Sequence, residues 1–427
     1  MPNLQINSQH LLDDINTLAT YTEPDTPGWT RRFPSAAYVR GRKWLRTRME
    51  AEGLRTRQDA AGNLFAQREG KQALPPIYAG SHTDTVMGGG RYDGILGVLG
   101  ALESARAIRE AGIELRHPFV VADYLSEEAT DYGIACMGSM IACTRDFKPE
   151  WLTRKVGETT LHEAIAQMGG QPDAMFEPSL NKGDVAASLE LHIEQGPVLE
   201  VRGVRLAAVS GIVGIRRAIF ELKGKSNHAG ATPMDLRKDP IAALGQMITA
   251  IEAIAQRHAP NGNGAVGTIG KIEVKPNQGN VIANHVISIP EMRSLNMAEL
   301  DAMWAEFMMI AQRACAERGV LLQLFNETRL ESVVPPQWLH ETVLGVCKKL
   351  APDAIATPSG AGHDTNYLAL IAPACMIFVP SVDGRSHAPE EHTLPEDLAL
   401  GVQALAEAIV AVDGLDLVPP LVHSAIL

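Results

Sequence analysis

The chain has 427 residues, of which 45% are hydrophobic and 21% charged, an ordinary composition for a globular protein. At this length we expect two domains. The net charge of −12 argues against a nucleic-acid partner, which needs a basic surface, but it leaves a small anionic substrate open. The five cysteines form no CxxC pair, so neither a disulfide framework nor a zinc ribbon is expected. The start of the chain lacks signal-peptide features, and no apolar run approaches the ~20 residues of a membrane span, so we expect a cytoplasmic protein.

Helical and strand-like patterns alternate through the first part of the chain. Short apolar strands between longer helices favour an α/β domain with a mixed, largely parallel sheet flanked by helices. In chain order we expect helices around 11–18 and 37–53, strands over 64–67 and 77–79, a helix over 94–112, and strands over 119–125 and 187–193.

From about residue 212 the order changes to β-α-β-β-α-β, which is typical of a ferredoxin-like module. After about residue 330 the α/β pattern resumes, and its last helix has a capping-box spacing at Thr393 and Glu396. We therefore expect a discontinuous catalytic domain over 1–211 and 330–427, interrupted by a smaller domain over 212–329. Within these parts the predicted elements are strands over 215–222, 266–274, 286–290, 320–324 and 374–379, and helices over 240–258, 296–317 and 337–350.

The first cluster of candidate site residues follows the strand that ends near Gly80. It contains His82, Asp84 and Asp93, and functional groups gather beyond the carboxyl ends of strands in open α/β sheets. His82 and Asp93 suit a divalent metal ion, and Asp84 is spaced to hydrogen-bond the far nitrogen of His82. The alternative is a surface histidine beside an acid that caps a helix.

Three further strand ends carry the same kinds of side chain. Glu127 and Glu128 follow one apolar strand, His192 lies at the end of another, and His387 follows a third. Neighbouring side chains in extended backbone point opposite ways, so one glutamate can bind metal while the other faces a water molecule. Two metal ions bridged by one carboxylate would use these ligands and leave one acid as a base. Singly, the residues could also be exposed acids or a structural histidine.

Seven ordered motifs give the chain a resemblance to a known family over essentially its whole length. They are GSHTDTV, GGRYDGILGVLGALE, the Glu-Glu pair, LELHIEQGPVLE, SNHAGATPMDLRKDP, SGAGHDTNYLAL and DGRSHAPEEHT. The sequence resembles the amidase/hydantoinase/carbamoylase family of N-carbamoyl-L-amino-acid hydrolases, β-ureidopropionases and allantoate amidohydrolases, which share a fold with dinuclear zinc aminopeptidases.

The resemblance implies a role for each matching residue. Each subunit would bind two divalent ions, zinc first, with manganese, cobalt or nickel as alternatives. Glu127 would be the general base, supported by Asp84. The metal ligands would be His82 and His192 on one ion, Glu128 and His387 on the other, and Asp93 as the bridge.

The resemblance also implies a substrate site and a homodimer, because His228 would reach the neighbouring subunit's active site and the inserted domain would act as a lid and dimerisation domain. Several of these candidates have a simpler alternative. Arg293 could pair with Glu291, and Asn280 could serve a turn. His228 could be an ordinary loop histidine, and His363 could support a ligand without contacting substrate. His392 stays unassigned. The implied substrate contacts are Gln195, His228, Asn280, Arg293, Gly362 and His363.

These features predict a metal-dependent hydrolase of the linear C–N bond in a carbamoyl (ureido) group. We expect a small ureido acid as substrate, namely an N-carbamoyl-L-amino acid that yields the amino acid, ammonia and carbon dioxide. Allantoate and β-ureidopropionate are alternatives, and a dimetal aminopeptidase, a dipeptidase or a non-catalytic binding protein is more remote. The chain departs from the usual family pattern at Glu291-Met292, at ATDYG after Glu128, and at Thr365, where alanine is usual.

Overall fold

The computed structural model describes residues 4–417, which form two compact units. Unit 1 consists of the described chain up to Ser210, Pro335–Thr357, and the described chain from His363 onward. Unit 2 consists of Gly211–Val334 and Pro358–Gly362. The expected boundary at 330 differs from this division. Residues up to Val334 stay with unit 2 because Val333 pairs with Ile212, and 358–362 join it because Val213 donates a hydrogen bond to the Ser359 carbonyl.

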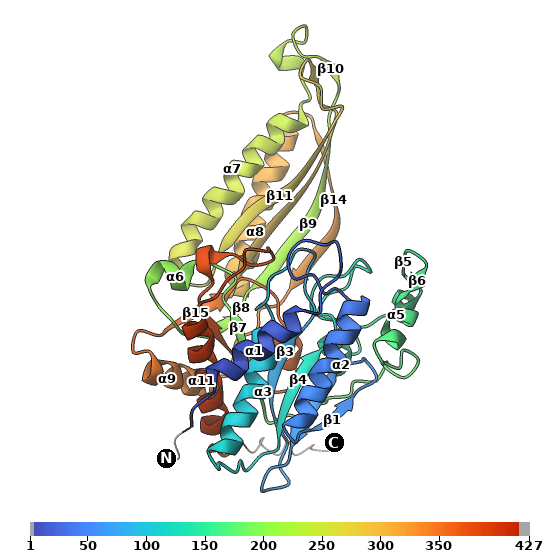
Figure 1. Cartoon of the computed structure of the whole chain (residues 1–427). Helices are drawn as coiled ribbons and strands as arrows, with labels where there is room; N and C mark the ends of the chain where they lie inside the picture. The colour runs from blue at the N-terminus through green and yellow to red at the C-terminus, as the bar shows by residue number, and fades with distance from the viewer. Residues whose placement is uncertain (1–3, 418–427) are drawn as a thin grey trace, which may run out of the picture. The chain divides into compact units, whose positions relative to one another are not determined.

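Unit 1 is built on an eight-stranded mixed sheet (Figure 1). Its four central strands, β4, β3, β7 and β16, run parallel, whereas β1 and β2 pair antiparallel with each other, β2 with β4, and β8 with β16. This confirms the predicted mixed, largely parallel sheet. The strands, in spatial order, are β1 (Arg55–Gln58), β2 (Leu64–Arg68), β4 (Phe119–Tyr124), β3 (Ile77–His82), β7 (Ala187–Ile193), β16 (Ala374–Val379), β8 (Ala207–Ile212) and β15 (Ile355–Ser359).

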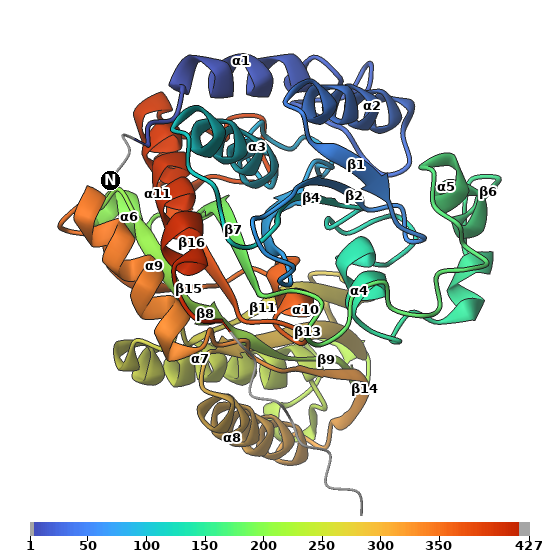
Figure 2. The ribbon, with the colours of Figure 1, turned by 90° about the horizontal axis from the view of Figure 1, so that it is seen from below.

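The central strands are buried at every position, as expected for parallel strands covered on both faces. Figure 2 shows helices on both sides of this sheet. Helices α3 and α11 pack on one face, and α4 and α10 on the other. Helix α3 is buried around nearly its whole circumference, because α1 and α11 cover it as well as the sheet. The helices of unit 1 are α1 (Ser8–Ala19), α2 (Ala36–Ala51), α3 (Ile95–Glu110), α4 (Met137–Cys143), α5 (Leu161–Gln167), α6 (Val198–Arg202), α9 (Gln337–Leu350), α10 (Thr365–Leu368) and α11 (Pro395–Asp413).

Unit 2 has the predicted β-α-β-β-α-β order, with an antiparallel sheet in the order β11-β13-β9-β14. Helices α7 and α8 cover one face, and burial along β13 alternates at every residue, the pattern of a sheet packed on one side. Asn296 caps α8 by accepting from the Glu299 N–H. The role of this unit as a lid or dimerisation domain stays a prediction. Its elements are β9 (Gly214–Lys223), β10 (Asn227–His228), α7 (Pro240–His258), β11 (Val266–Lys275), β12 (Val281–Ile282), β13 (His285–Ser294), α8 (Met297–Ala316) and β14 (Leu321–Leu330).

One predicted helix start is wrong. Helix α11 begins at Pro395 after Leu394, without a side-chain cap, because the Thr393 hydroxyl donates instead to the Pro380 carbonyl at 2.9 Å. Among residues 4–417, no helix combines the length and the apolar character that crossing a membrane requires.

Candidate metal centre

The candidate metal ligands lie at one edge of the unit 1 sheet. His82 is the last residue of β3, Glu127 and Glu128 follow β4, His192 is near the end of β7, and His387 follows β16. Because these four strands are parallel neighbours, their carboxyl ends meet at the same edge. The sheet therefore gathers residues from distant parts of the sequence.

Asp93 lies at the centre of this group. Its Oδ1 is 3.1 Å from His192 Nε2 and 3.6 Å from His82 Nε2. Its Oδ2 is 3.1 Å from His387 Nε2, which is itself 3.4 Å from Glu128 Oε1. Two triads of potential ligands, His82–Asp93–His192 and Asp93–Glu128–His387, thus share one carboxylate.

The chemistry of this donor set fits divalent cations. Glu128 is buried, and its Oε1 has no hydrogen-bond partner among the described residues, which is costly for a carboxylate unless a cation binds it. Burial, together with the nearby charges of Asp93 and Glu127, raises the pKa of Glu128 well above its ordinary value. Histidine nitrogens and carboxylates at one point are the ligands that zinc and related ions take.

Backbone contacts orient the two buried histidines. His82 Nδ1 lies 3.1 Å from the Asp84 carbonyl, and His192 Nδ1 lies 2.9 Å from the Ile193 carbonyl. A carbonyl only accepts, so each Nδ1 carries the proton and each Nε2 faces Asp93 as an acceptor. The Nε2 of His192 also accepts the Gly94 N–H at 3.1 Å.

Asp84 makes closer contacts than the predicted one to His82. Its carboxylate Oδ1 is 3.5 Å from His82 Nδ1, farther than its own carbonyl. The carboxylate instead accepts the backbone N–H groups of Glu127 and Glu128, each at 3.2 Å. Asp84 therefore holds the turn that carries both glutamates.

Glu391, which the sequence pattern did not single out, holds the loop of Asp93. Its buried carboxylate accepts the backbone N–H groups of Tyr92 and Asp93 at 3.0 and 3.2 Å. Its other oxygen lies 2.8 Å from the Ser386 hydroxyl, which also lies 2.8 Å from Asp93 Oδ2. The signal for it was the Glu-Glu pair in APEEHT, but nothing in the pattern indicated which acid turns inward. His392, which the sequence left unassigned, packs against Tyr92 in an edge-to-face arrangement.

Glu127 lies beside the metal triads without being part of them. Its Oε2 is 3.7 Å from His82 Nε2, and its Oε1 accepts a hydrogen bond from the Cys136 thiol at 3.2 Å. Burial raises the pKa of Glu127 to about 6, against the lowering effect of His82. A carboxylate with a pKa near neutrality is suited to general acid–base chemistry.

Two other predicted residues of the substrate site pack against the ligands. Gln195 Nε2 donates to Asp93 Oδ2 at 2.8 Å, while its buried Oε1 has no hydrogen-bond partner among the described residues. His363 is 2% exposed and packs edge to face on the ring of His192, with ring centroids 4.7 Å apart. Burial lowers the pKa of His363 well below its ordinary value, so this ring is neutral.

Thr365 is explained by a second residue that the sequence pattern did not indicate. The buried Glu190 accepts from the Ser81 hydroxyl and the Thr365 hydroxyl, each at 2.6 Å, and from the Thr365 N–H at 3.2 Å. The unusual threonine therefore adds a hydrogen bond to an acid whose carboxylate lies within 4.8 Å of ring nitrogens of His192 and His363.

The remaining predicted residues belong to unit 2. His228 Nδ1 accepts the N–H groups of Gly230 and Ala231 at 3.1 Å, so the proton is on Nε2. The carbonyl of Asn280 accepts from the Ala229 N–H, next to His228. Arg293 pairs with Glu291 at 2.6 Å and also donates to the Gly360 carbonyl. The roles of these residues and of exposed Gly362 in substrate binding stay predictions.

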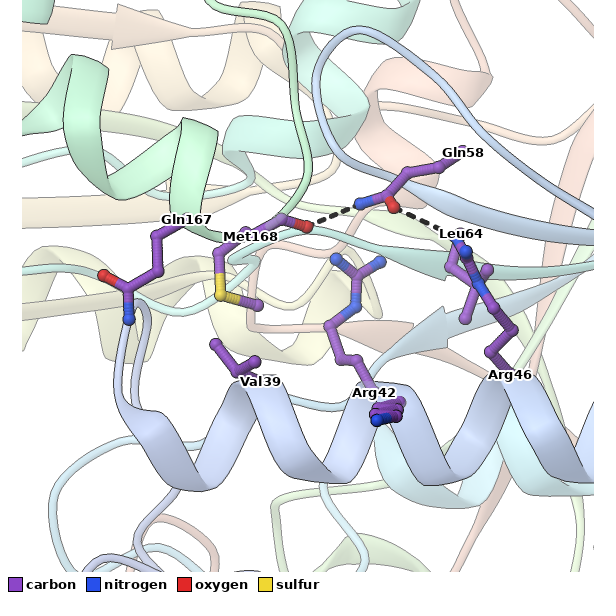
Figure 3. Close-up of a pocket in the computed structure, with 8 residues that line it drawn as sticks. Val39, Arg42, Arg46, Gln58, Leu64, Gln167 and Met168 are labelled. Carbon is purple, nitrogen blue, oxygen red and sulfur yellow. Dashed lines mark hydrogen bonds between the residues drawn. The ribbon is translucent and has the colours of Figure 1, made fainter.

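A separate pocket of unit 1, with a cavity volume of about 170 Å³, lies over helix α2 (Figure 3). Arg42 and Arg46 rise from this helix, and the Gln58 amide bridges Arg46 and the Met168 carbonyl. None of the candidate metal ligands lines this pocket.

Comparisons with known proteins identify the family of this chain. The model of Peptidase family M20/M25/M40 matches residues 69–411. The chain is 35% identical to an N-carbamoyl-L-amino acid amidohydrolase of Geobacillus stearothermophilus, over 95% of this chain and 98% of that protein. It is 32% identical to a ureidoglycolate hydrolase of Oryza sativa subsp. japonica, over 95% of this chain and 84% of that protein. The crystal structure of an amidase of the hydantoinase/carbamoylase family from Burkholderia multivorans is similar to this structure, with a TM-score of 0.89 and 30% sequence identity. The match covers 96% of this chain and 99% of that one. The chain therefore belongs to peptidase family M20/M25/M40, and within it to the hydantoinase/carbamoylase amidases.

Proposed function

We propose that this hydrolase cleaves the linear C–N bond of the carbamoyl group in N-carbamoyl-L-amino acids, giving the amino acid, ammonia and carbon dioxide. The observation that carries the proposal is the pair of triads that share the buried Asp93, with the acid Glu127 beside them and in neither triad. The N-carbamoyl-L-amino acid amidohydrolase of Geobacillus stearothermophilus supports this choice of substrate.

We expect two divalent metal ions per subunit, with zinc as the first candidate and manganese, cobalt or nickel as alternatives. His82 and His192 would hold one ion, Glu128 and His387 the other, and Asp93 both. When bound, such ions activate water and polarise a carbonyl oxygen.

Glu127 takes the proton from the attacking water and returns it to the leaving nitrogen. Burial raises the pKa of Glu127 above its ordinary value, which makes it a stronger base than an exposed glutamate. Gln195 donates through Nε2 to Asp93, and its free Oε1 is suited to accept an N–H of the ureido group.

We expect a homodimer in which His228 serves the neighbouring subunit. Its Nε2–H, fixed by the two N–H groups that occupy Nδ1, is the donor needed for the negative oxygen of the tetrahedral intermediate. Such a donor contributes roughly 3 kcal/mol to transition-state stabilisation. Asn280 and Arg293 would bind the substrate carboxylate, with Arg293 shared with Glu291.

The substrate class is tested by ammonium release from an N-carbamoyl-L-amino acid, allantoate, ureidoglycolate and β-ureidopropionate. Metal-free protein would be loaded in turn with zinc, manganese, cobalt and nickel. We expect the N-carbamoyl-L-amino acid to give the highest kcat/KM. A higher kcat/KM for allantoate or ureidoglycolate would show that the proposed substrate is wrong. Cleavage of dipeptides without ammonium release would show that the protein is a peptidase instead.

The base is tested by Glu127→Gln. This variant should keep its metal content and lose kcat by roughly 100- to 10,000-fold, the range for a general acid–base group. Unchanged turnover in a correctly metallated variant would refute the role of Glu127.

A further inference from the structure

The turn that carries Glu127 and Glu128 is fastened to the beginning of helix α4. The N–H groups of Cys136, Met137 and Gly138 donate to the carbonyls of Glu127, Ser126 and Leu125 at 2.6, 2.9 and 2.8 Å. The first N–H groups of a helix have no partner inside the helix, so this contact satisfies the helix and fixes the turn together. The backbone of Glu127 is thereby tied to Cys136.

The side chain of Cys136 makes a second contact with the same glutamate. Its thiol donates to Glu127 Oε1 at 3.2 Å, and it does not cap the helix although Cys136 occupies the N-cap position. Burial raises the pKa of this thiol well above its ordinary value, so it stays protonated and remains a donor. The Ser139 hydroxyl lies 3.2 Å from the Cys136 carbonyl and 2.5 Å from Asp364.

Cys136 has left-handed backbone angles, φ 47° and ψ 37°. Glycine adopts this conformation without the steric penalty that a side chain brings, so the turn alone would favour glycine. The chain nevertheless has cysteine at this position, and its side chain reaches Glu127.

We infer that Cys136 is a positioning residue for Glu127: its thiol holds Oε1 and leaves Oε2, the oxygen nearer His82, to receive the proton. The inference rests on the proposed function of Glu127 as the base. A carboxylate free to rotate about its last bond would present either oxygen and would spend less time in the productive orientation.

The test compares Cys136→Ala, Cys136→Ser and Cys136→Gly with wild type and with the control Cys143→Ala. Cys143 is a buried cysteine at the end of the same helix that does not contact Glu127. Alanine and serine differ by one hydroxyl, so only serine can replace the lost donor. Glycine removes the thiol and relaxes the left-handed backbone, which keeps the test valid if alanine impairs folding.

We expect Cys136→Ala and Cys136→Gly to lower kcat roughly tenfold, as for loss of a weak hydrogen bond to a charged group, with metal content unchanged and KM little changed. Serine should recover most of the loss, and Cys143→Ala should behave as wild type. Wild-type kcat in Cys136→Ala, or equal losses in the alanine and serine variants, would overturn the inference.

The infrared S–H stretch separates this inference from the proposed function. The band that disappears in Cys136→Ala should lie at a lower frequency than the band that disappears in Cys143→Ala, because its hydrogen bond weakens the S–H bond. It should shift upward in Glu127→Gln. Absence of this shift overturns the inference even in an active enzyme, whereas the shift in a protein that hydrolyses no ureido substrate would refute the proposed function alone.

Discussion

Replacing Gly94 with alanine should remove His82 from the metal centre. Gly94 has φ 69°, and a Cβ built there would lie 2.3 Å from His82 Nε2, about 1 Å inside ordinary contact at 3.4 Å. Since metal–ligand distances tolerate only about 0.2 Å, the imidazole cannot stay in a ligating position. Mutating a residue that only supports a metal ligand typically lowers metal affinity by roughly 10- to 100-fold. We expect Gly94→Ala to lower it by about 100-fold or more, because a ligand itself is displaced.

The control is Gly112→Ala, because Gly112 also has positive φ (67°), but a Cβ added there would meet no atom within 4 Å. Both variants place a Cβ on backbone with positive φ, which a side chain disfavours, whereas only Gly94→Ala brings that Cβ against the histidine. Metal titration by isothermal calorimetry and metal analysis after dialysis would measure the difference. Equal metal affinity in the two variants would refute this account of the Asp93 loop.

Two further predictions concern charge. Burial opposes ionisation of Glu52, but hydrogen bonds and charges from Arg106 and Arg48 outweigh it and lower the pKa of Glu52 from 4.5 to about 2. A lowered folded-state pKa gives stability that is present above pH 4.5 and lost as pH falls toward about 2, so wild type should lose up to about 3 kcal/mol relative to Glu52→Gln over that window. Urea unfolding of both proteins measures this, and parallel pH profiles would contradict it. Glu291→Gln should release Arg293 and lower KM for a carboxylate substrate roughly fivefold, from about 1 kcal/mol, in steady-state assays. An unchanged KM would argue against Arg293 as the carboxylate binder.

The positions of the candidate ligands could be anticipated because a parallel sheet determines them. Apolar strands followed at once by His, Asp or Glu place those side chains at one edge, whatever their separation in sequence. The same logic could not assign the contacts within the edge. Asp84 was expected to bind the far nitrogen of His82, but two backbone N–H groups of the next strand end lie closer to its carboxylate.

Contacts between elements distant in sequence account for the other differences. Strands β1, β8 and β15 escaped prediction because β1 is a polar edge strand, and the other two include small residues or proline. The capping-box spacing at Thr393 was overridden by the Pro380 carbonyl, which comes from the end of β16. Local pattern describes which groups are available, but tertiary neighbours decide which hydrogen bonds form.

Arg42 connects two places that look unrelated in the sequence. Its guanidinium lines the pocket over α2 (Figure 3) and donates to Asp123 Oδ2 at 2.6 Å, while Asp123 Oδ1 accepts from the Thr83 hydroxyl at 2.8 Å. Thr83 stands directly between His82 and Asp84. Neutralising Arg42 would leave the buried Asp123 carboxylate without its cation, typically at a cost of roughly 3–5 kcal/mol. Asp123 also holds Thr83, the residue next to the candidate metal ligand His82. Part of the sequence of α2 is thus constrained by a buried acid that also holds Thr83, the neighbour of the candidate ligand His82.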